Sequence, residues 1–289
     1  MPGFGTVVFA LPGDPTSGKC GDKPCPAAVV AQIRAKYNLD DPLPVAYAKY
    51  MGKVFTGDLG ENSYGFKVTK DLAERYPTTV KLGVIALLTE SLVGIAAGVL
   101  TALRKGRFLD NLVLVSTLVV ISIPIFVLGY LAQVYLGVKL KWFPVTVPNP
   151  PTLWSLVLPG LVLGSLSMAY VTRLTRASLS EAMHSDYVRT AKAKGLRPRR
   201  VVGVHALRNS MIPVITFIGY DFGALLGGAI VTERIFNIQG IGGYIFRGIS
   251  QRDGFAVVGA VTALVLVYLF VNLLVDLLYG LLDPRISHD

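Results

Sequence analysis

The sequence predicts an all-α integral membrane protein. Of its 289 residues, 52% are hydrophobic and only 16% are charged, whereas soluble domains carry about a quarter charged residues. Five segments are apolar over the roughly 20 residues that a helix needs to cross the hydrocarbon core of a bilayer. The net charge of +10 gathers in loops between these segments, which is typical of the cytosolic side of a membrane rather than of nucleic-acid binding.

Each of the five predicted spans carries at most one charged residue. The charged residue is Glu90 in one span and Asp221 in another. Soluble helices rarely exceed 20 residues without a polar face, so five such segments argue against a large soluble protein with buried core helices. The predicted spans are Leu82–Leu103, Leu112–Val138, Leu153–Thr172, Ser210–Thr232 and Phe255–Val275.

The basic loops predict how the chain is oriented in the membrane. The loop 173–209 holds nine Lys and Arg residues, and the link 104–111 holds three, so both are expected in the cytosol together with the tail 284–289. The segment 12–78 has nine basic and eight acidic residues and is expected outside. The chain therefore divides into this extracytoplasmic segment and a transmembrane domain over residues 79–283.

The N-terminal segment Met1–Leu11 is apolar but short. As a helix it would span only about 16 Å, roughly half of a bilayer. It also lacks the basic start of a signal peptide. The simplest interpretation is the remnant of a first transmembrane helix that has lost its start, and the alternative is a five-span protein whose N-terminus lies outside.

The extracytoplasmic segment is predicted to contain two short helices, over Ala27–Tyr37 and Val45–Phe55, followed by a turn at Gly57–Gly60. Cys20 and Cys25 precede them in a C-x4-C spacing, which is not a zinc site because a second ligand pair is missing. The two cysteines are either unlinked thiols or a small disulfide loop outside the cytosol. Nothing in this segment indicates catalysis, and we expect it to pack against a partner.

A further short helix is predicted within the cytosolic loop, over residues 185–195. Gly195 is well placed to cap its C-terminal end. Tyr187, Val188 and Ala191 can share one apolar face at helical spacing, which would suit insertion into a groove on another protein. The alternative is a solvated basic loop that only fixes the topology.

Two runs in this loop carry a family resemblance. Arg189-Thr190-Ala191-x3-Gly195 is followed at the right spacing by His205-Ala206-Leu207-Arg208. In these runs the chain resembles the inner-membrane permeases of bacterial dipeptide and oligopeptide ABC importers, whose loop motif is approximately E-A-A-x3-G, nine residues and I-x-L-P. The glutamate and the final proline are absent here, and peptide-type permeases are similar in both departures. Further peptide-type features are Leu39-Asp40-x-Pro42, Gly57-Asp58-x-Gly60, Glu233-x-Ile235-Phe236 with Gly240-Ile241-Gly242, and Asp276-Leu-Leu-Tyr-Gly280 with Asp283-Pro284-Arg285.

The resemblance implies the transmembrane domain of a type I ABC importer in the bacterial plasma (inner) membrane. Such a chain forms half of the pathway and works with a second permease, two cytosolic ATPase subunits and an extracytoplasmic substrate-binding protein. The partner ATPases use ATP and Mg, while this chain binds no cofactor and is not catalytic. It contains no G-x4-G-K-[ST] loop, so the ATPase is a separate polypeptide. The residues that the resemblance assigns to coupling with the ATPase are Tyr187, Arg189, Thr190, Ala191, Gly195 and His205.

Charged residues inside spans are costly and are candidates for function. Asp221 and Glu90 are candidate pathway residues that would attract the ammonium end of a peptide; the alternative is that each acid is paired within the subunit or with the partner permease. Asp276 is expected to anchor the interface or to pack with Asn272, and the three acids offer no recognisable pairing motif. No catalytic or metal-binding set is predicted. The remaining alternatives are the same scaffold importing nickel, glutathione or another small solute, a membrane enzyme using Asp221 and Glu90, and a receptor or scaffold whose basic loop binds a cytosolic partner.

Overall fold

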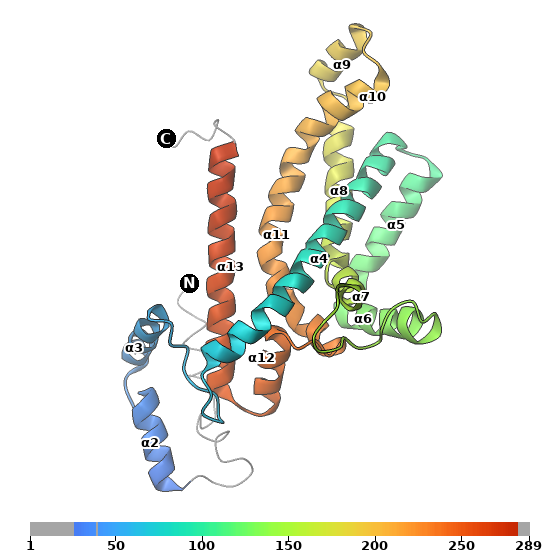
Figure 1. The fold of residues 1–289 in the computed structure, drawn as a ribbon. Coiled ribbons are helices and arrows are strands. Elements are labelled where there is room, and N and C mark those ends of the chain that lie inside the picture. Colours follow the sequence, from blue (N-terminus) through green and yellow to red (C-terminus); the bar gives the residue numbers. More distant parts are fainter. Residues whose placement is uncertain (1–25, 39, 283–289) are drawn as a thin grey trace. The chain divides into compact units, whose positions relative to one another are not determined.

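The computed structural model describes residues 26–38 and 40–282, and within these ranges the chain forms helices and no β-strand (Figure 1). The predicted all-α class is therefore confirmed. The predictions for Met1–Leu11, for Cys20 and Cys25 and for the tail 284–289 lie outside the described residues. The chain divides into two compact units, one with the described residues up to Thr79 and Gln239–Val267, the other with Val80–Ile238 and the described residues from Tyr268.

The first unit contains the two predicted extracytoplasmic helices. Helix α2 spans Ala27–Tyr37 and α3 spans Leu43–Phe55, so α3 begins two residues earlier than expected. Pro42 lies at the N-cap of α3, and a second proline occupies its first turn, where a missing backbone N–H costs nothing. Asn38 ends α2 in the left-handed conformation, with φ of 53°.

The loop after α3 is held by the start of α13 (Gly254–Leu282) and by Asp253 just before it. Helix α12 (Ile241–Ser250) belongs to the same unit. Asp253 precedes α13 and accepts hydrogen bonds from the backbone N–H of Ala256 at 3.1 Å and of Ser63 at 2.6 Å. Further along α13, a Cβ on Gly259 would lie only 2.6 Å from the carbonyl oxygen of Leu59. Glycine at this position therefore allows the loop to lie directly on the helix.

Three helical stretches are long and apolar enough to cross a membrane alone: Val68–Leu103, Pro198–Ile235 and Gly254–Leu277. They contain three of the five predicted spans. Two helices, α4 (Val68–Leu103) and α13, are divided between the two units. Besides parts of these two, the second unit contains α5 (Phe108–Ser122), α6 (Ile125–Ala132), a π-helix (Gln133–Lys139), α7 (Leu153–Leu163), α8 (Ser165–Ala182), α9 (Asp186–Ala193), α10 (Pro198–Arg200), a second π-helix (Val201–Leu207) and α11 (Arg208–Ile235).

The other two predicted spans, Leu112–Val138 and Leu153–Thr172, are bent rather than straight. The first is broken between α5 and the α6–π segment with an angle of 108°, because Pro124 forces the residue before it out of the helical conformation. The second bends by 61° between α7 and α8, at Gly164. The described residues thus hold three straight candidate spans, or up to five if each bent pair counts as one.

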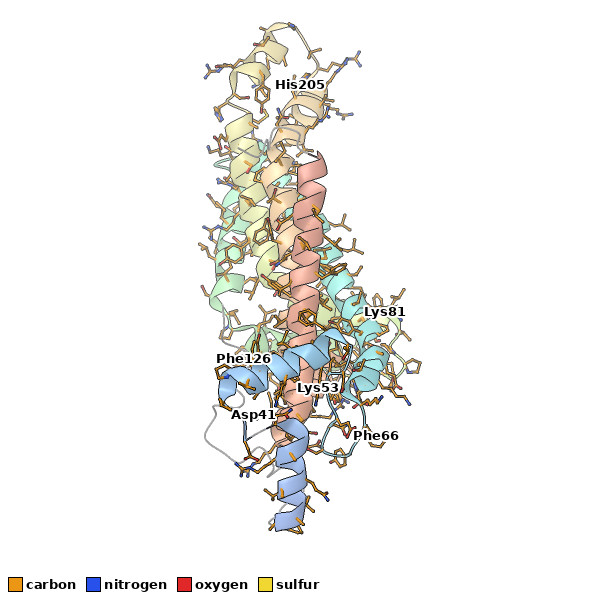
Figure 2. All side chains as sticks on the ribbon, turned by 90° about the vertical axis from the view of Figure 1, so that its left-hand side faces the viewer. Asp41, Lys53, Phe66, Lys81, Phe126 and His205 are labelled. Atoms are coloured by element: carbon orange, nitrogen blue, oxygen red, sulfur yellow. The ribbon has the colours of Figure 1, made fainter. Side chains whose placement is uncertain are left out.

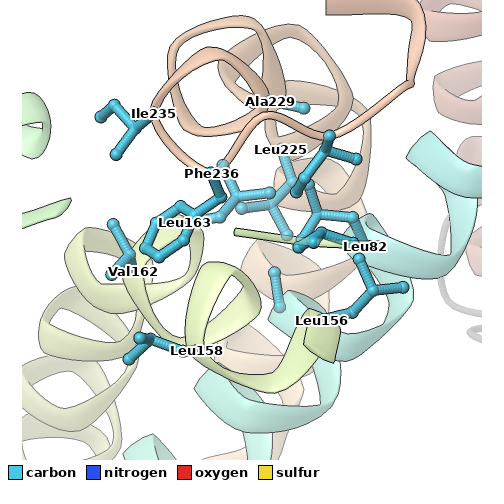
Figure 3. Packing of buried hydrophobic residues seen from close by; sticks show 12 residues of the cluster. Leu82, Leu156, Leu158, Val162, Leu163, Leu225, Ala229, Ile235 and Phe236 are labelled. Carbon is cyan, nitrogen blue, oxygen red and sulfur yellow. The ribbon is translucent and has the colours of Figure 1, made fainter. Parts of the chain in front are cut away.

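The core of the second unit is an apolar cluster between α4, α7 and α11 and the segment that follows α11 (Figure 3). Leu156 and Phe236 are fully buried in it. Hydrogen bonds from a side chain to the backbone add to this packing, since the side-chain amide of Gln133 donates to the carbonyl oxygens of Val145 and Ile235 at 2.8 and 2.9 Å. The other members of the cluster include Leu82, Leu158, Val162, Leu163, Leu225, Ala229 and Ile235.

Helix α4 approaches α8 unusually closely, because small residues recur on α4 with a spacing of four. A Cβ on Gly94 would lie 2.8 Å from a side-chain methyl of Val171. One turn further on, a Cβ on Gly98 would lie 2.5 Å from the Cβ of Thr175 and 2.7 Å from the carbonyl oxygen of Thr172. The two helices are therefore in backbone contact, and neither glycine can be enlarged without moving them apart.

We predict that Gly98→Ala destabilises the protein by about 1–3 kcal/mol, because the added methyl group meets backbone and Cβ atoms that cannot rotate away. Thermal unfolding of the detergent-purified protein measures the effect. The matched control is Gly52→Ala on α3, where an added Cβ meets no atom within 4 Å. Equal melting temperatures for the two variants would contradict the close packing of α4 and α8.

Candidate functional site: the α9 surface and the intramembrane acids

The predicted helix in the basic loop is present as α9, Asp186–Ala193. Gly195 follows it with φ of +74°, and the N–H groups of Gly195 and Leu196 bond back to the carbonyl oxygens of Lys192 and Ala191. This is the left-handed C-terminal cap that the sequence predicts. An added Cβ at Gly195 meets no atom within 4 Å, so a larger residue here would strain the backbone without a clash inside the chain.

The expectation that Val188 and Ala191 face a groove on another protein is wrong, because both side chains are packed inside this chain. Whether α9 contacts another protein stays a prediction. Val188 is fully buried and Ala191 is 5% exposed. Only Tyr187 of the predicted face is open, at 41% exposed. The cluster that covers the other two consists of Leu179, Ala182, Val201 and Ala206, with Val99, Ala102, Met183, Leu196 and Leu207 packed around it.

The outward face of α9 is polar and basic. Arg189 has a side chain 72% exposed, and its contact with Asp186, at 3.4 Å, joins two side chains that both lie in solvent. Thr190 is exposed as well, with its hydroxyl donating to the carbonyl oxygen of Asp186. The exposed basic residues of this surface are Arg189, Lys192, Lys194, Arg197, Arg199 and Arg200; we call these six residues the basic surface.

Most of the rest of the predicted loop 173–209 is helical, apart from the turns at residues 183–185 and 194–197. Residues 173–182 extend α8, and residues 201–209 form the second π-helix and the start of α11. His205 lies half-buried in that π-helix, which packs against α9, and Figure 2 labels it at this end of the unit. The structure thus gathers all six predicted coupling residues at one end of the α8–α11 pair, although Ala191 faces inward.

A buried ion pair braces α8 close to this end. Arg176 donates from Nε and Nη2 to the two carboxylate oxygens of Asp110, at 2.6 and 2.8 Å. Asp110 is 1% exposed and also accepts the backbone N–H of Gly106, which turns the chain between α4 and α5. The sequence does not reveal this pair, since Asp110 and Arg176 are 66 residues apart and belong to no motif.

The two intramembrane acids lie together. Glu90 on α4 is fully buried, and the polar side chains that interact with it are Asp221 on α11 and Ser167 on α8. The sequence alone offered no motif that pairs these acids, because they are 131 residues apart, from 90 to 221. Their proximity comes from the packing of α8 against α11 and the close contact of α4 with α8.

The third acid, Asp276, has a hydrogen-bond partner that the sequence did not predict, and its expected place at an interface stays a prediction. It is exposed and accepts a hydrogen bond from the hydroxyl of Tyr220 on α11. Asn272, which was the expected neighbour, lies against Gly223, where an added Cβ would be 3.2 Å from its amide oxygen. Asp276 therefore links α13 to α11 through an exposed hydrogen bond.

The first unit contains a polar cluster that sequence reasoning missed. The guanidinium of Arg75 lies 5.3 Å from the ring centre of Tyr244, and Asn62 donates to Asp71 at 3.0 Å. Burial raises the pKa of Tyr244 above its ordinary value, and the nearby charge of Asp71 acts in the same direction, so the phenol stays neutral. The glycine run 240–243 begins α12 beside this cluster and has a structural role at the N-terminus of a helix.

Among residues 26–38 and 40–282, no group of three or more His, Cys, Asp and Glu side chains is arranged to hold a metal ion.

Residues 94–288 match the family of binding-protein-dependent transport system inner membrane components, and residues 4–83 match the N-terminal region of such membrane components. The dipeptide transport system permease DppB of Bacillus subtilis is 38% identical, with 98% of this chain and 92% of the relative covered.

Two further relatives have similar coverage. The di/tripeptide transport system permease DppB of Pseudomonas aeruginosa is 37% identical over 98% of this chain and 92% of its own length. The dipeptide transport system permease DppB of Escherichia coli is 36% identical over 97% of this chain and 92% of its own length. The similarity thus extends along both compact units.

We predict that Asp110→Asn lowers the free energy of unfolding by about 1–3 kcal/mol, because it leaves the partly buried Arg176 guanidinium without its counter-charge. The control is Asp41→Asn, which breaks an exposed pair with Lys49 and should cost less than about 1 kcal/mol. Chemical denaturation of both variants measures the difference. A cost for Asp110→Asn as small as that of the control would mean that the brace contributes little.

Proposed function

Because the chain belongs to the family of inner membrane components of binding-protein-dependent transport systems, we propose that it is the permease subunit of an ATP-driven importer of dipeptides or oligopeptides. The observation that carries the proposal is the identity of 36–38% to dipeptide permeases over 97–98% of the chain. The peptide-type departures at Arg189 and Arg208 in the loop motif support the same substrate class.

Nickel, glutathione or another small solute is the alternative cargo for the same scaffold. Uptake of labelled di- and oligopeptides by cells that carry or lack the gene tests the choice. We expect the deletion to abolish peptide uptake and leave nickel and glutathione uptake unchanged; the reverse pattern would remove the peptide assignment.

The chain works as one of several subunits in this proposal. A second permease completes the pathway, two cytosolic ATPases supply ATP and Mg chemistry, and an extracytoplasmic protein delivers the substrate. The chain itself is expected to be non-catalytic, and ATP-independent chemistry by the purified chain would instead support a membrane enzyme using Glu90 and Asp221. Co-purification with two ATPases and a second permease is the expected result for an importer, whereas capture of an unrelated cytosolic protein alone would favour a receptor or scaffold.

The α9 end of the second unit is the proposed contact with an ATPase. The burial of Val188 and Ala191 ties α9 rigidly to α8 and to the second π-helix, so a push on α9 is passed directly to two long helices. The surface left for the ATPase is Tyr187, Thr190 and the basic surface. We therefore expect an ATPase groove with acidic residues, since the six exposed cations would be attracted to it.

We predict that Arg189→Glu lowers ATP-driven peptide uptake at least about tenfold at unchanged membrane level, because it places a negative charge in the middle of this surface. The control is Arg104→Glu, an exposed basic residue of the expected cytosolic side that is outside α9. Uptake is measured in proteoliposomes with membrane level followed by immunoblot. Normal uptake by Arg189→Glu would contradict the contact.

The substitutions Gly195→Glu and Ala191→Glu distinguish loss of coupling to the ATPase from loss of folding at α9. Gly195→Glu strains the left-handed cap and adds charge in open space, so we expect an inserted but uncoupled protein. Ala191→Glu buries a charge in the apolar cluster and is expected to lower the membrane level itself. An Ala191→Glu protein with a normal membrane level and normal uptake would contradict the buried face.

The proposed orientation places α9 and the C-terminal tail in the cytosol. Lys194→Cys in a background lacking Cys20 and Cys25 should react with a membrane-impermeant thiol reagent only after the membrane is opened, whereas Lys53→Cys on α3 should react in intact spheroplasts. Labelling of Lys194→Cys from outside would reverse the orientation and remove the ATPase contact with it.

A further inference from the structure

Glu90 has an environment that an isolated carboxylate does not tolerate. Its side chain is fully buried, and neither of its carboxylate oxygens receives a hydrogen bond of normal geometry from the described residues. Its interacting polar neighbours are a second acid, Asp221, and the hydroxyl of Ser167. Asp221 also has one buried oxygen, Oδ2, without a hydrogen-bond partner.

The position of Glu90 follows from the close contact between α4 and α8. Glu90, Gly94 and Gly98 are spaced four residues apart and therefore share one face of α4. Gly94 and Gly98 meet Val171 and Thr175, which are four residues apart on α8. Continuing this alignment by one turn places Glu90 beside Ser167, which agrees with their interaction. Because the glycines fix the two backbones, Glu90 is held between α8 and α11.

The two acids lack a positively charged partner within the described chain. Among the described residues the charged group that interacts with Glu90 is Asp221, and no Lys, Arg or His does so. Ionised carboxylates only accept hydrogen bonds, so two of them side by side require both a donor and a positive charge. The Ser167 hydroxyl can supply one donor and no charge. What is missing is a cation that donates hydrogen bonds.

We propose that Glu90 and Asp221 form a binding site for one positively charged hydrogen-bond donor inside the membrane domain. Two sources have this chemistry: a proton delivered by hydronium, which leaves water behind and becomes an O–H of one carboxyl group that donates to the other carboxylate, and the α-ammonium group of a transported peptide. The full burial of Glu90 means that a proton fits the packing described here, whereas an ammonium group reaches the site only when α4 and α11 separate. The ammonium source rests on the proposed peptide transport, and the proton source does not.

Two neutral variants of similar shape, Glu90→Gln and Asp221→Asn, test the site. The matched control is Asp276→Asn, because Asp276 lies in the same unit but is exposed and already bonded to Tyr220. Each variant is reconstituted with its co-purifying subunits, and uptake of a dipeptide is compared with uptake of the same dipeptide acetylated at its N-terminus. The external binding protein is the same in every assay, so its affinity for a given peptide contributes equally to the KM of every variant. An effect of the site is therefore read from kcat.

An ammonium occupant predicts that Glu90→Gln and Asp221→Asn each lower kcat for the free-amine dipeptide at least about tenfold, with a much smaller effect on the acetylated one. A proton occupant predicts equal effects on both peptides. It also predicts an infrared carbonyl band of a protonated carboxylic acid in the wild-type protein that disappears in Glu90→Gln. In either case Asp276→Asn behaves as wild type.

Two results would overturn the site. In the first, both variants match Asp276→Asn with each peptide, and the wild-type protein lacks the carboxylic acid band. In the second, Glu90→Gln fails to insert or fold. Glutamine has the shape of glutamate and no charge, so this failure would mean that Glu90 is ionised and paired with a fixed cation. Wild-type uptake driven by ATP is recorded in the same experiment, so loss of the site is distinguished from loss of the proposed transport function.

Discussion

The backbone contact between α4 and α8 determines how the second unit is built. Gly94 and Gly98 remove the side chains that would otherwise separate the two helices, and Val171 and Thr175 fill the space. In a membrane, helix association depends on such close packing because the lipid offers no hydrophobic driving force between helices. The same contact fixes the position of Glu90 along the axis of α8. It also joins α4 to the helix that precedes α9.

The buried carboxyl groups of Asp110 and Glu90 in this unit have opposite kinds of partner. Asp110 is neutralised by a two-point contact with Arg176 and by a backbone N–H, which is the arrangement that makes a buried ion pair tolerable. Glu90 faces another acid and no cation from the described residues. The first pair neutralises its own charges, whereas two neighbouring acids inside a span are candidates for function.

Helix α9 shows how an amphipathic pattern can be assigned to the wrong partner. Its apolar residues have the spacing of a docking face, but the chain folds back so that Val188 and Ala191 complete a cluster with Leu179 and Val201. The polar side is then the one presented outward, with Arg189 at its centre. This end of the α8–α11 pair therefore presents a basic surface, with the apolar side of α9 packed inside the chain.

The sequence by itself determined that the protein is helical, that it lies in a membrane, where most of its long apolar helices are and to which family it is similar. These properties depend on composition, periodicity and local motifs, and the caps at Pro42 and Gly195 follow from local backbone chemistry. The segments 1–11 and 284–289 and the two cysteines remain sequence-based predictions. Pro124 could have predicted the bend in the span Leu112–Val138, but length and hydropathy alone treat the two helical segments as one span.

The tertiary structure decided which side of α9 is buried, that Asp110 meets Arg176, that Asp276 meets Tyr220, and that Glu90 lies beside Asp221. Each of these contacts joins residues from different helices, and the helical period says which face a residue occupies but not which helix that face meets. That choice depends on the shapes of packed surfaces, here on glycines that let α4 and α8 approach.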